Sequence, residues 1–205
     1  MCGIVGIFSN KNNNNNIFLD LFEALYHLQH RGQDSYGFAM LDENYKYNIV
    51  KNKGLLVNNK TNLNGIMGIG HVRYPTNGAN TINEAQPFIH KGKYHSLLLV
   101  HNGQVWKTDK LYNYFKKNNL NYDTNTDTEL ILYLLSFECN KYEILTNNII
   151  KQIIDHISSL LEGSYSCICI IMNYGMIVFK DKKGIRPLIL GINKNNDYLI
   201  SSESV

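Results

Sequence analysis

Short β-strand-like runs stand on both sides of two long helical patterns in this sequence, and this order limits the folds that the chain can adopt. An apolar N-terminal strand comes first, and four further runs precede the two helices: Tyr36–Leu41, Tyr45–Lys51, Met67–Tyr74 and Ser96–His101. Four more follow the helices: Tyr165–Met172, Met176–Lys180, Leu188–Gly191 and Tyr198–Ser201. Strands, then helices, then strands, without regular β-α alternation, predict an α+β fold rather than a doubly wound parallel sheet. No internal repeat or linker is visible, so residues 1–205 are expected to form one domain.

Three segments have the spacing of helices. Apolar residues recur at intervals of three and four over Phe18–Gln29, which predicts an early amphipathic helix. The Asn12–Asn16 run before it is interpreted as an expanded surface loop. The second helix begins at Thr126, where a capping residue and early acidic side chains precede an apolar run. The third is predicted over Asn148–Leu161.

Charge and cysteine content exclude several classes of function. The chain has 20 basic and 17 acidic side chains, and a net charge of +3 is too small to indicate nucleic acid or an anionic membrane as a partner. No apolar run approaches the ~18 residues that a membrane span needs. The N-terminus lacks the basic region and cleavage site of a secretory signal. The four cysteines have no regular spacing, so we expect a reducing, cytoplasmic location.

Cys2 becomes the first residue of the chain if Met1 is removed, which its small side chain permits. The thiol and the free α-amine then sit on one carbon, and the amine, with a reference pKa of about 7.7–8.0, can accept the thiol proton near neutral pH. One residue would supply both the nucleophile and its base, as an N-terminal threonine does in other hydrolases. Position alone, however, favours a buried apolar cysteine in a terminal strand.

Other segments supply groups that would suit an amino-acid substrate. Asn102 and Gly103 follow an apolar strand and offer two N–H donors, as an oxyanion hole needs, although an Asn-Gly pair is also a common hairpin turn. Arg73 ends another strand and suits bidentate binding of a carboxylate. Asp127, at the start of a helix, suits an ammonium group, although helix capping is the alternative role.

These segments resemble the class II glutamine amidotransferase domains, which belong to the N-terminal-nucleophile hydrolases. Within this family the likeness is to the glutaminase domain of glutamine phosphoribosylpyrophosphate amidotransferases, enzymes of purine synthesis. The resemblance implies a four-layer αββα sandwich of two antiparallel sheets. The matching segments follow one another along the whole chain: Cys2–Ile7, Leu28–Asp34, Gly68–Thr76, Glu84–Phe88, His101–Gly103, Thr126–Glu129, Gly163–Cys167, Gly184–Leu188 and Ser202–Val205.

The resemblance also implies a reaction. Cys2 corresponds to the nucleophile that attacks the side-chain amide of glutamine, and Asn102 and Gly103 correspond to the oxyanion-hole donors. A proton from the α-amine leaves with ammonia, and water releases glutamate from a γ-glutamyl thioester at Cys2. We therefore expect a glutaminase that uses L-glutamine and needs neither a metal nor another cofactor.

The resemblance assigns binding and supporting roles as well. Arg73 corresponds to the residue that holds the α-carboxylate of glutamine, and Thr76 belongs to the loop that lines the pocket. Asp127 corresponds to the partner of the substrate ammonium group. Arg31 and Gly32 match a segment that lies against the nucleophile, where a supporting role is expected.

Two departures from the resembled enzyme shape the expected function. The sequence stops at Val205, where a phosphoribosyltransferase domain would begin, so we expect that domain to be absent and the ammonia acceptor to be a separate synthase subunit. Trp106 stands near a position where relatives often carry a second Asn, at the expected rim of the pocket. Two alternatives remain: the glutaminase half of another amidotransferase, such as glucosamine-6-phosphate synthase or asparagine synthetase, and a non-catalytic glutamine-binding or regulatory remnant.

Some further patterns are interpreted as structural. Cys167 and Cys169 share one face of a strand without other ligands nearby, which favours core packing over a metal site. His71 is expected to be structural rather than catalytic. The glycines of Gly65–Gly70 lack the order and the following helix of a dinucleotide-binding fingerprint.

Overall fold

Two β-sheets form the centre of the molecule in this computed structural model, which describes residues 2–10, 17–57, 63–74, 82–120 and 126–204. The helices are α1 (Ile17–His27), α2 (Asp109–Lys117), α3 (Asp127–Cys139) and α4 (Asn147–Leu160), with short 3-10 turns η1 (Leu28–Arg31) and η2 (Ile82–Glu84). The strands are β1 (Gly3–Phe8), β2 (Ser35–Leu41), β3 (Tyr47–Lys53), β4 (Met67–Arg73), β5 (Phe88–Lys91), β6 (Ser96–Trp106), β7 (Glu162–Ile171), β8 (Gly175–Lys180), β9 (Ile189–Ile192) and β10 (Tyr198–Ser201).

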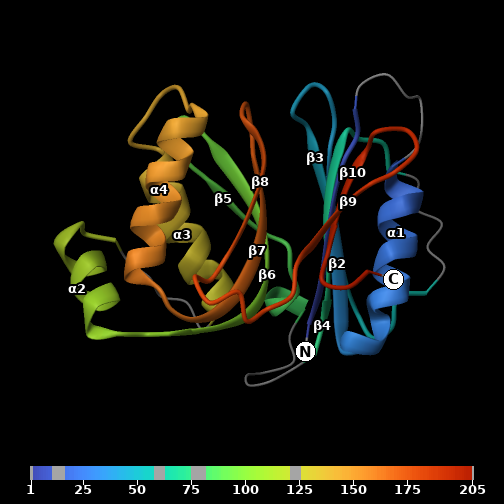
Figure 1. Cartoon of the computed structure of the whole chain (residues 1–205), viewed down its shortest axis with the longest axis horizontal. Coiled ribbons are helices and arrows are strands. Elements are labelled where there is room, and N and C mark those ends of the chain that lie inside the picture. The colour runs from blue at the N-terminus through green and yellow to red at the C-terminus, as the bar shows by residue number, and fades with distance from the viewer. Residues whose placement is uncertain (1, 11–16, 58–62, 75–81, 121–125, 205) are drawn as a thin grey trace.

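The two sheets lie face to face between layers of helix. One sheet has six strands in the order β3-β2-β4-β1-β10-β9, and the other has four in the order β5-β6-β7-β8. Every pair of neighbouring strands in the described residues is antiparallel. Helix α1 covers the outer face of the six-stranded sheet, while α3 and α4 cover the outer face of the other (Figure 1). The expected α+β class and the four-layer αββα arrangement are confirmed.

The alternation of side chains along the strands divides the core into layers. In β6, Leu97 and Leu99 pack toward the helices, whereas Leu98 and Val100 pack between the sheets. The same period of two runs along β7 and β1, because successive side chains of a strand point to opposite faces. In β1, Ile4 faces the other sheet and Val5 faces α1. A residue of these strands therefore faces the inter-sheet layer or a helix according to its position.

The predicted helices are confirmed with small shifts at their ends. Helix α1 ends at His27, and the 3-10 turn Leu28–Arg31 completes the predicted segment. Thr126 caps α3 as predicted: its hydroxyl accepts the Glu129 N–H at 3.2 Å and donates to the Glu129 carboxylate at 3.0 Å. The third predicted helix is α4. The Asn12–Asn16 loop lies outside the described residues.

Four elements depart from the sequence-based prediction. Strand β6 was expected to end at His101 but continues to Trp106, paired with β7 along its whole length. Strand β3 begins two residues later than predicted. The short β5 and the polar helix α2, which buries only Leu111 and Phe115, were not predicted. A strand of four residues is too short for its alternation to be recognised, and α2 is a short, mostly polar helix in which few apolar residues mark the buried face.

Truncating Leu98 tests the inter-sheet layer. Because Leu98 is fully buried between the sheets, Leu98→Ala is expected to lower the free energy of unfolding by about 2–5 kcal/mol. Leu190→Ala is the matched control, since Leu190 is 64% exposed, and it should change the free energy by less than about 0.5 kcal/mol. Urea denaturation measures both variants. Equal losses in the two would contradict the assigned core.

Candidate active site

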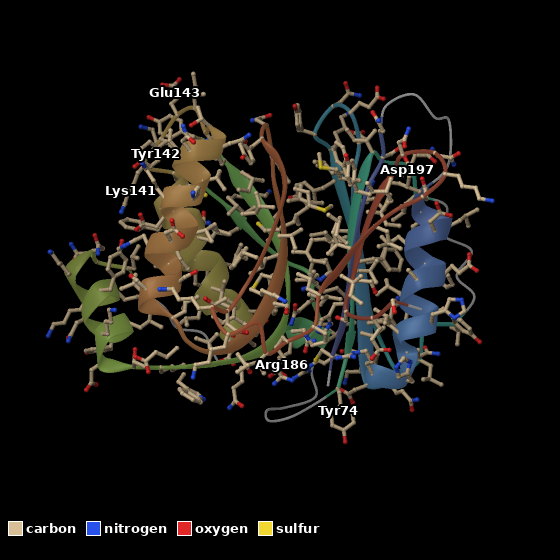
Figure 2. All side chains as sticks on the ribbon, in the orientation of Figure 1. Tyr74, Lys141, Tyr142, Glu143, Arg186 and Asp197 are labelled. Carbon is tan, nitrogen blue, oxygen red and sulfur yellow. The ribbon has the colours of Figure 1, made fainter. Side chains whose placement is uncertain are left out.

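Cys2 stands directly before β1, beside the end of β4. In the β1–β4 register Gly3 pairs with Val72, so Cys2 continues the ladder opposite Arg73. The Cys2 Sγ lies 3.8 Å from the carbonyl oxygen of Tyr74. Because Ile4 faces the inter-sheet layer, the alternation of β1 carries Cys2 to the same side. The thiol is thus at one end of the space between the sheets, where Figure 2 marks Tyr74.

Arg31 anchors the backbone of Cys2. Its Nε donates to the Cys2 carbonyl oxygen at 3.0 Å, and its Nη1 forms an ion pair with Glu203. The Arg31 side chain is buried, and Glu203 also contacts the His30 Nε2 at 3.0 Å. The hydrogen bond from Arg31, with the charges of Arg31 and His30, holds the pKa of Glu203 below its ordinary value, although partial burial opposes this. Arg31 therefore joins the chain start to a segment near residue 203.

Gly32 lets η1 approach the end of β4 closely. A Cβ atom at this position would lie 2.5 Å from the backbone carbon of Arg73 and 2.6 Å from the carbonyl oxygen of Val72. No flexible side chain can move away to relieve these contacts, because both neighbours are backbone atoms. The supporting role expected of Arg31 and Gly32 remains a prediction about function, and in the structure both lie against the strand ends that hold Cys2 and Arg73.

Asn102 and Gly103 lie inside β6 rather than in a turn, so the predicted strand end at His101 was wrong. Asn102 pairs with Ser166 and Gly103 with Tyr165 across the sheet. The strand continues because Gly103 adopts a φ of +154°, which brings it so close to β7 that a Cβ would lie 2.1 Å from the carbonyl oxygen of Ser164. Since Leu98 and Val100 face the other sheet, Asn102 faces it too.

Three buried amide or guanidinium nitrogens have no hydrogen-bond partner among the described residues. They are the side-chain amide Nδ2 of Asn102, the Nη1 of Arg73 and the Nη2 of Arg31. Asn102 is 2% exposed, so its amide donor is also cut off from bulk water. A buried polar group without a partner is costly and calls for an explanation. Arg73 lies opposite Cys2 in the β1–β4 register, and Arg31 binds the Cys2 carbonyl oxygen. Donors of this kind suit a carbonyl oxygen or a carboxylate.

Asp127 contacts β6 instead of capping its own helix. The Oδ2 of Asp127 accepts the Val105 N–H at 2.9 Å, whereas Thr126 is the N-cap. Burial raises the pKa of Asp127, although the Val105 hydrogen bond and the charge of Lys107 act in the opposite direction. Its carboxylate is thus held two residues beyond Gly103. In the described part of the chain no hydrogen bond or ion pair joins Asp127 to Cys2 or Arg73.

Two histidines next to the site are buried and uncharged. Burial lowers the pKa of His71 to about 3, with further contributions from His101 and Arg73, and burial with the charge of Arg186 does the same for His101. The His101 Nδ1 lies 3.2 Å from the Thr128 hydroxyl. His71 forms no hydrogen bond with its ring nitrogens in the described residues, and the structural role expected of it stays a prediction.

Sequence reasoning did not assign roles to several residues that hold this region together. Gln86 bridges the backbone of His101, accepting its N–H at 2.6 Å and donating to its carbonyl oxygen at 3.2 Å. Glu84 binds Arg73, and Glu203 binds Arg31. The Ser166 hydroxyl donates to the carbonyl oxygen of Arg186, a residue labelled in Figure 2, at 3.0 Å. The only signal for these residues was their position in the matching segments.

The remaining expected residues are placed as follows. Thr76 lies outside the described residues. Trp106 stands at the end of β6 and is 59% exposed. Cys167 and Cys169 are buried in the layer between the four-stranded sheet and the helices, where burial raises the pKa of both thiols. Among the described residues no group of three or more acidic, histidine or cysteine side chains is arranged to hold a metal ion.

A second hollow lies elsewhere on the molecule. This groove has a volume of about 560 Å³ and runs between β8 and the β9–β10 edge, lined by apolar side chains that include Met176, Leu188 and Ile200. It contains none of the expected site residues. In the portion of the chain that the structure describes, no helix is long and apolar enough to cross a membrane.

Sequence comparison finds relatives along the whole chain. A family model described as a glutamine amidotransferase domain matches residues 71–205. The chain is 37% identical over 217 residues to the amidophosphoribosyltransferase of Pasteurella multocida (strain Pm70) and 37% identical over 218 residues to that of Escherichia coli (strain K12). Each alignment covers 100% of this chain and 42% of the relative. The chain thus spans less than half of the length of these relatives.

Solved structures agree with this likeness. A glutamine phosphoribosylpyrophosphate amidotransferase from B. subtilis, complexed with ADP and GMP, superposes with a TM-score of 0.77 at 28% sequence identity. A structure described as the allosteric regulatory enzyme of purine biosynthesis gives a TM-score of 0.79 at 29% identity. Both comparisons cover 99% of this chain and 42% of the other.

The Arg31–Glu203 pair predicts a pH dependence of stability. The folded state lowers the pKa of Glu203 from its ordinary value of 4.5, so the stabilisation is present above pH 4.5 and is lost as the pH falls through the folded-state pKa. The difference in unfolding free energy between wild type and Glu203→Gln should therefore shrink as the pH falls below 4.5. Urea denaturation at a series of pH values measures it. A difference independent of pH would contradict the ion pair.

Proposed function

Because the chain belongs to the glutamine amidotransferase domain family, we propose that it hydrolyses the side-chain amide of glutamine to glutamate and ammonia through a thioester at Cys2. The observation that carries this proposal is that two buried nitrogens have no partner among the described residues: the amide nitrogen of Asn102, and one guanidinium nitrogen of Arg73, which lies opposite Cys2 in the β1–β4 register. A substrate with a carbonyl oxygen at one end and a carboxylate at the other would satisfy such donors. Glutamine has both.

The chemistry requires Cys2 to be the first residue. Once Met1 is removed, the α-amine accepts the thiol proton and the thiolate attacks the amide carbon of glutamine. The Asn102 amide and the Gly103 N–H stabilise the oxyanion that forms. The protonated α-amine gives its proton to the leaving ammonia, and a γ-glutamyl thioester remains. Water then attacks the thioester, glutamate leaves, and the thiol is regenerated.

Arg73 and Asp127 are proposed to bind the amino-acid end of glutamine. Arg73 offers a buried guanidinium nitrogen to the α-carboxylate, and the Asp127 carboxylate is proposed to receive the ammonium group. Thr76 would belong to the loop between Arg73 and η2. Arg31 and Gly32 would keep the strand ends in position rather than contact the reacting atoms.

We further propose that the ammonia serves amidophosphoribosyl transfer on a synthase partner. This rests on the relatives, which are amidophosphoribosyltransferases aligned over 42% of their length. A cytoplasmic location is proposed because all four cysteines are free, which suits a reducing compartment.

Removal of the Cys2 thiol is expected to abolish glutamate release. Cys2→Ala lacks the nucleophile, whereas the control Cys169→Ala loses a buried thiol remote from the site and should remain active per folded molecule. Glutamate production measures the activity, and the intact mass of each preparation establishes that Met1 is absent. Full activity of Cys2→Ala would rule out the nucleophile. Glutamine binding by calorimetry without any turnover by wild type would favour the non-catalytic alternative.

Loss of the Asn102 amide is expected to slow the chemical step more than it weakens binding. Removal of one oxyanion donor lowers kcat by about 10²- to 10³-fold in comparable sites. Asn102→Ala should therefore lower kcat by about this factor, while KM for glutamine stays within about threefold of wild type. Steady-state kinetics with a thermal unfolding control measures the change. An effect confined to KM would contradict the oxyanion role.

A further inference from the structure

A second residue controls the Arg73 guanidinium. The Arg73 Nη2 lies 2.5 Å from the Glu84 Oε2, and the two side chains are only 11% and 17% exposed. The other terminal nitrogen, Nη1, is buried and without a partner in the described part of the chain. We propose that Glu84 is a positioning residue that holds Arg73 so that its free nitrogen meets the α-carboxylate of glutamine. This role rests on the proposed glutaminase function.

The position of Glu84 is fixed by the segment that follows it. Ala85 is buried, and its N–H donates to the Ile82 carbonyl oxygen at 3.1 Å, which closes the η2 turn. One residue further, Gln86 is bound to both backbone groups of His101, next to Asn102. Glu84 therefore projects from a short segment that is attached to β6. The same segment thus connects the carboxylate-binding group with the oxyanion donor.

This connection bears on the choice of substrate. Glutamine carries its carboxylate and its reacting amide a fixed number of bonds apart, so the separation between Arg73 and Asn102 must suit that length. Glu84 restrains Arg73, and Gln86 restrains the strand that carries Asn102. Three consecutive residues therefore set the spacing of two groups that come from different sheets. Without such a partner, the long and flexible side chain of Arg73 would adopt several conformations, and its separation from Asn102 would not be fixed.

The contacts of Arg73 also indicate that Glu84 positions this side chain and does not take the place of the glutamine carboxylate. A guanidinium has five N–H donors, and Glu84 contacts only one of the two terminal nitrogens. The free Nη1 keeps its donors for a second carboxylate. In the absence of substrate, Glu84 also compensates a cation that is largely removed from water, which would otherwise be costly. Glu84 and glutamine are therefore expected to bind Arg73 together.

The test separates recognition of the amino-acid end from reactivity of the thiol. Glu84→Gln should raise KM for glutamine about tenfold, as expected for loss of a charged hydrogen bond, and change kcat by less than about threefold. Modification of Cys2 by a glutamine analogue that carries a diazoketone should slow by the same factor of about ten. Modification by iodoacetamide, which has no α-carboxylate, should keep its wild-type rate. Intact-mass spectrometry measures both modification rates.

Two controls complete the experiment. Glu143→Gln removes one carboxylate from the exposed surface, far from Tyr74 in Figure 2, and should change none of these quantities. In an Arg73→Gln background, Glu84→Gln should have no further effect on KM, because a positioning residue acts only through the group that it holds.

Several outcomes would overturn the positioning role. A lower KM or faster reaction with the analogue would mean that Glu84 competes with glutamine for Arg73. If modification by the analogue and by iodoacetamide slowed by the same factor, the substitution would distort the site as a whole. If both modification rates stayed at their wild-type values, Glu84 would not act on recognition. Failure of the proposed function looks different: wild type itself would hydrolyse no glutamine, and the positioning role would fall with it.

Discussion

The apolar layer between the two sheets determines where the polar groups of the candidate site lie. Ile4, Ile69, Val100 and Ile168 face one another across this layer, each from a different strand. Successive inward positions of a strand are two residues apart, so the layer continues to Cys2 just before β1, to His71 and Arg73 in β4, and to Asn102 in β6. The candidate site is thus the polar end of a core whose other members are apolar. Displacement of one sheet against the other would separate Cys2 from the Asn102 amide.

Buried arginines add a second constraint, because each must be compensated by a carboxylate from elsewhere. Arg31 is paired with Glu203, 172 positions away in the sequence, and Arg73 is paired with Glu84. In both pairs one terminal nitrogen contacts the carboxylate, and the other is buried without a partner in the described residues. The carboxylate reduces the cost of removing the cation from water, and the free nitrogen remains available to a ligand.

The sequence predicted the layers better than the details of the site. The spacing of apolar residues, every second position in strands and every third or fourth in helices, was sufficient to predict α1, α4 and most strands. A buried face requires apolar side chains at these regular intervals. The length of β6 was mispredicted, since Asn102-Gly103 is a common turn pair and the local sequence does not show the close approach to β7 that a φ of +154° at Gly103 allows. Pairs such as Arg31 with Glu203 join distant segments and leave no local pattern. Cys2 and Arg73 were identified by motif resemblance, not by periodicity.

The way in which Cys2 is held is compatible with the free N-terminus that the proposed chemistry requires. Arg31 binds the carbonyl oxygen of Cys2 at 3.0 Å, and Ile4 is fixed by Ser202, whose hydroxyl accepts the Ile4 N–H at 3.0 Å and whose own N–H donates to the Ile4 carbonyl oxygen at 3.0 Å. These contacts restrain the chain on the carboxyl side of the Cys2 Cα and make no use of its nitrogen. Removal of Met1 would therefore leave the anchoring intact while it creates the α-amine that the chemistry needs. Anchoring through the carbonyl is the arrangement that allows one residue to be both firmly placed and chemically free at its amino end.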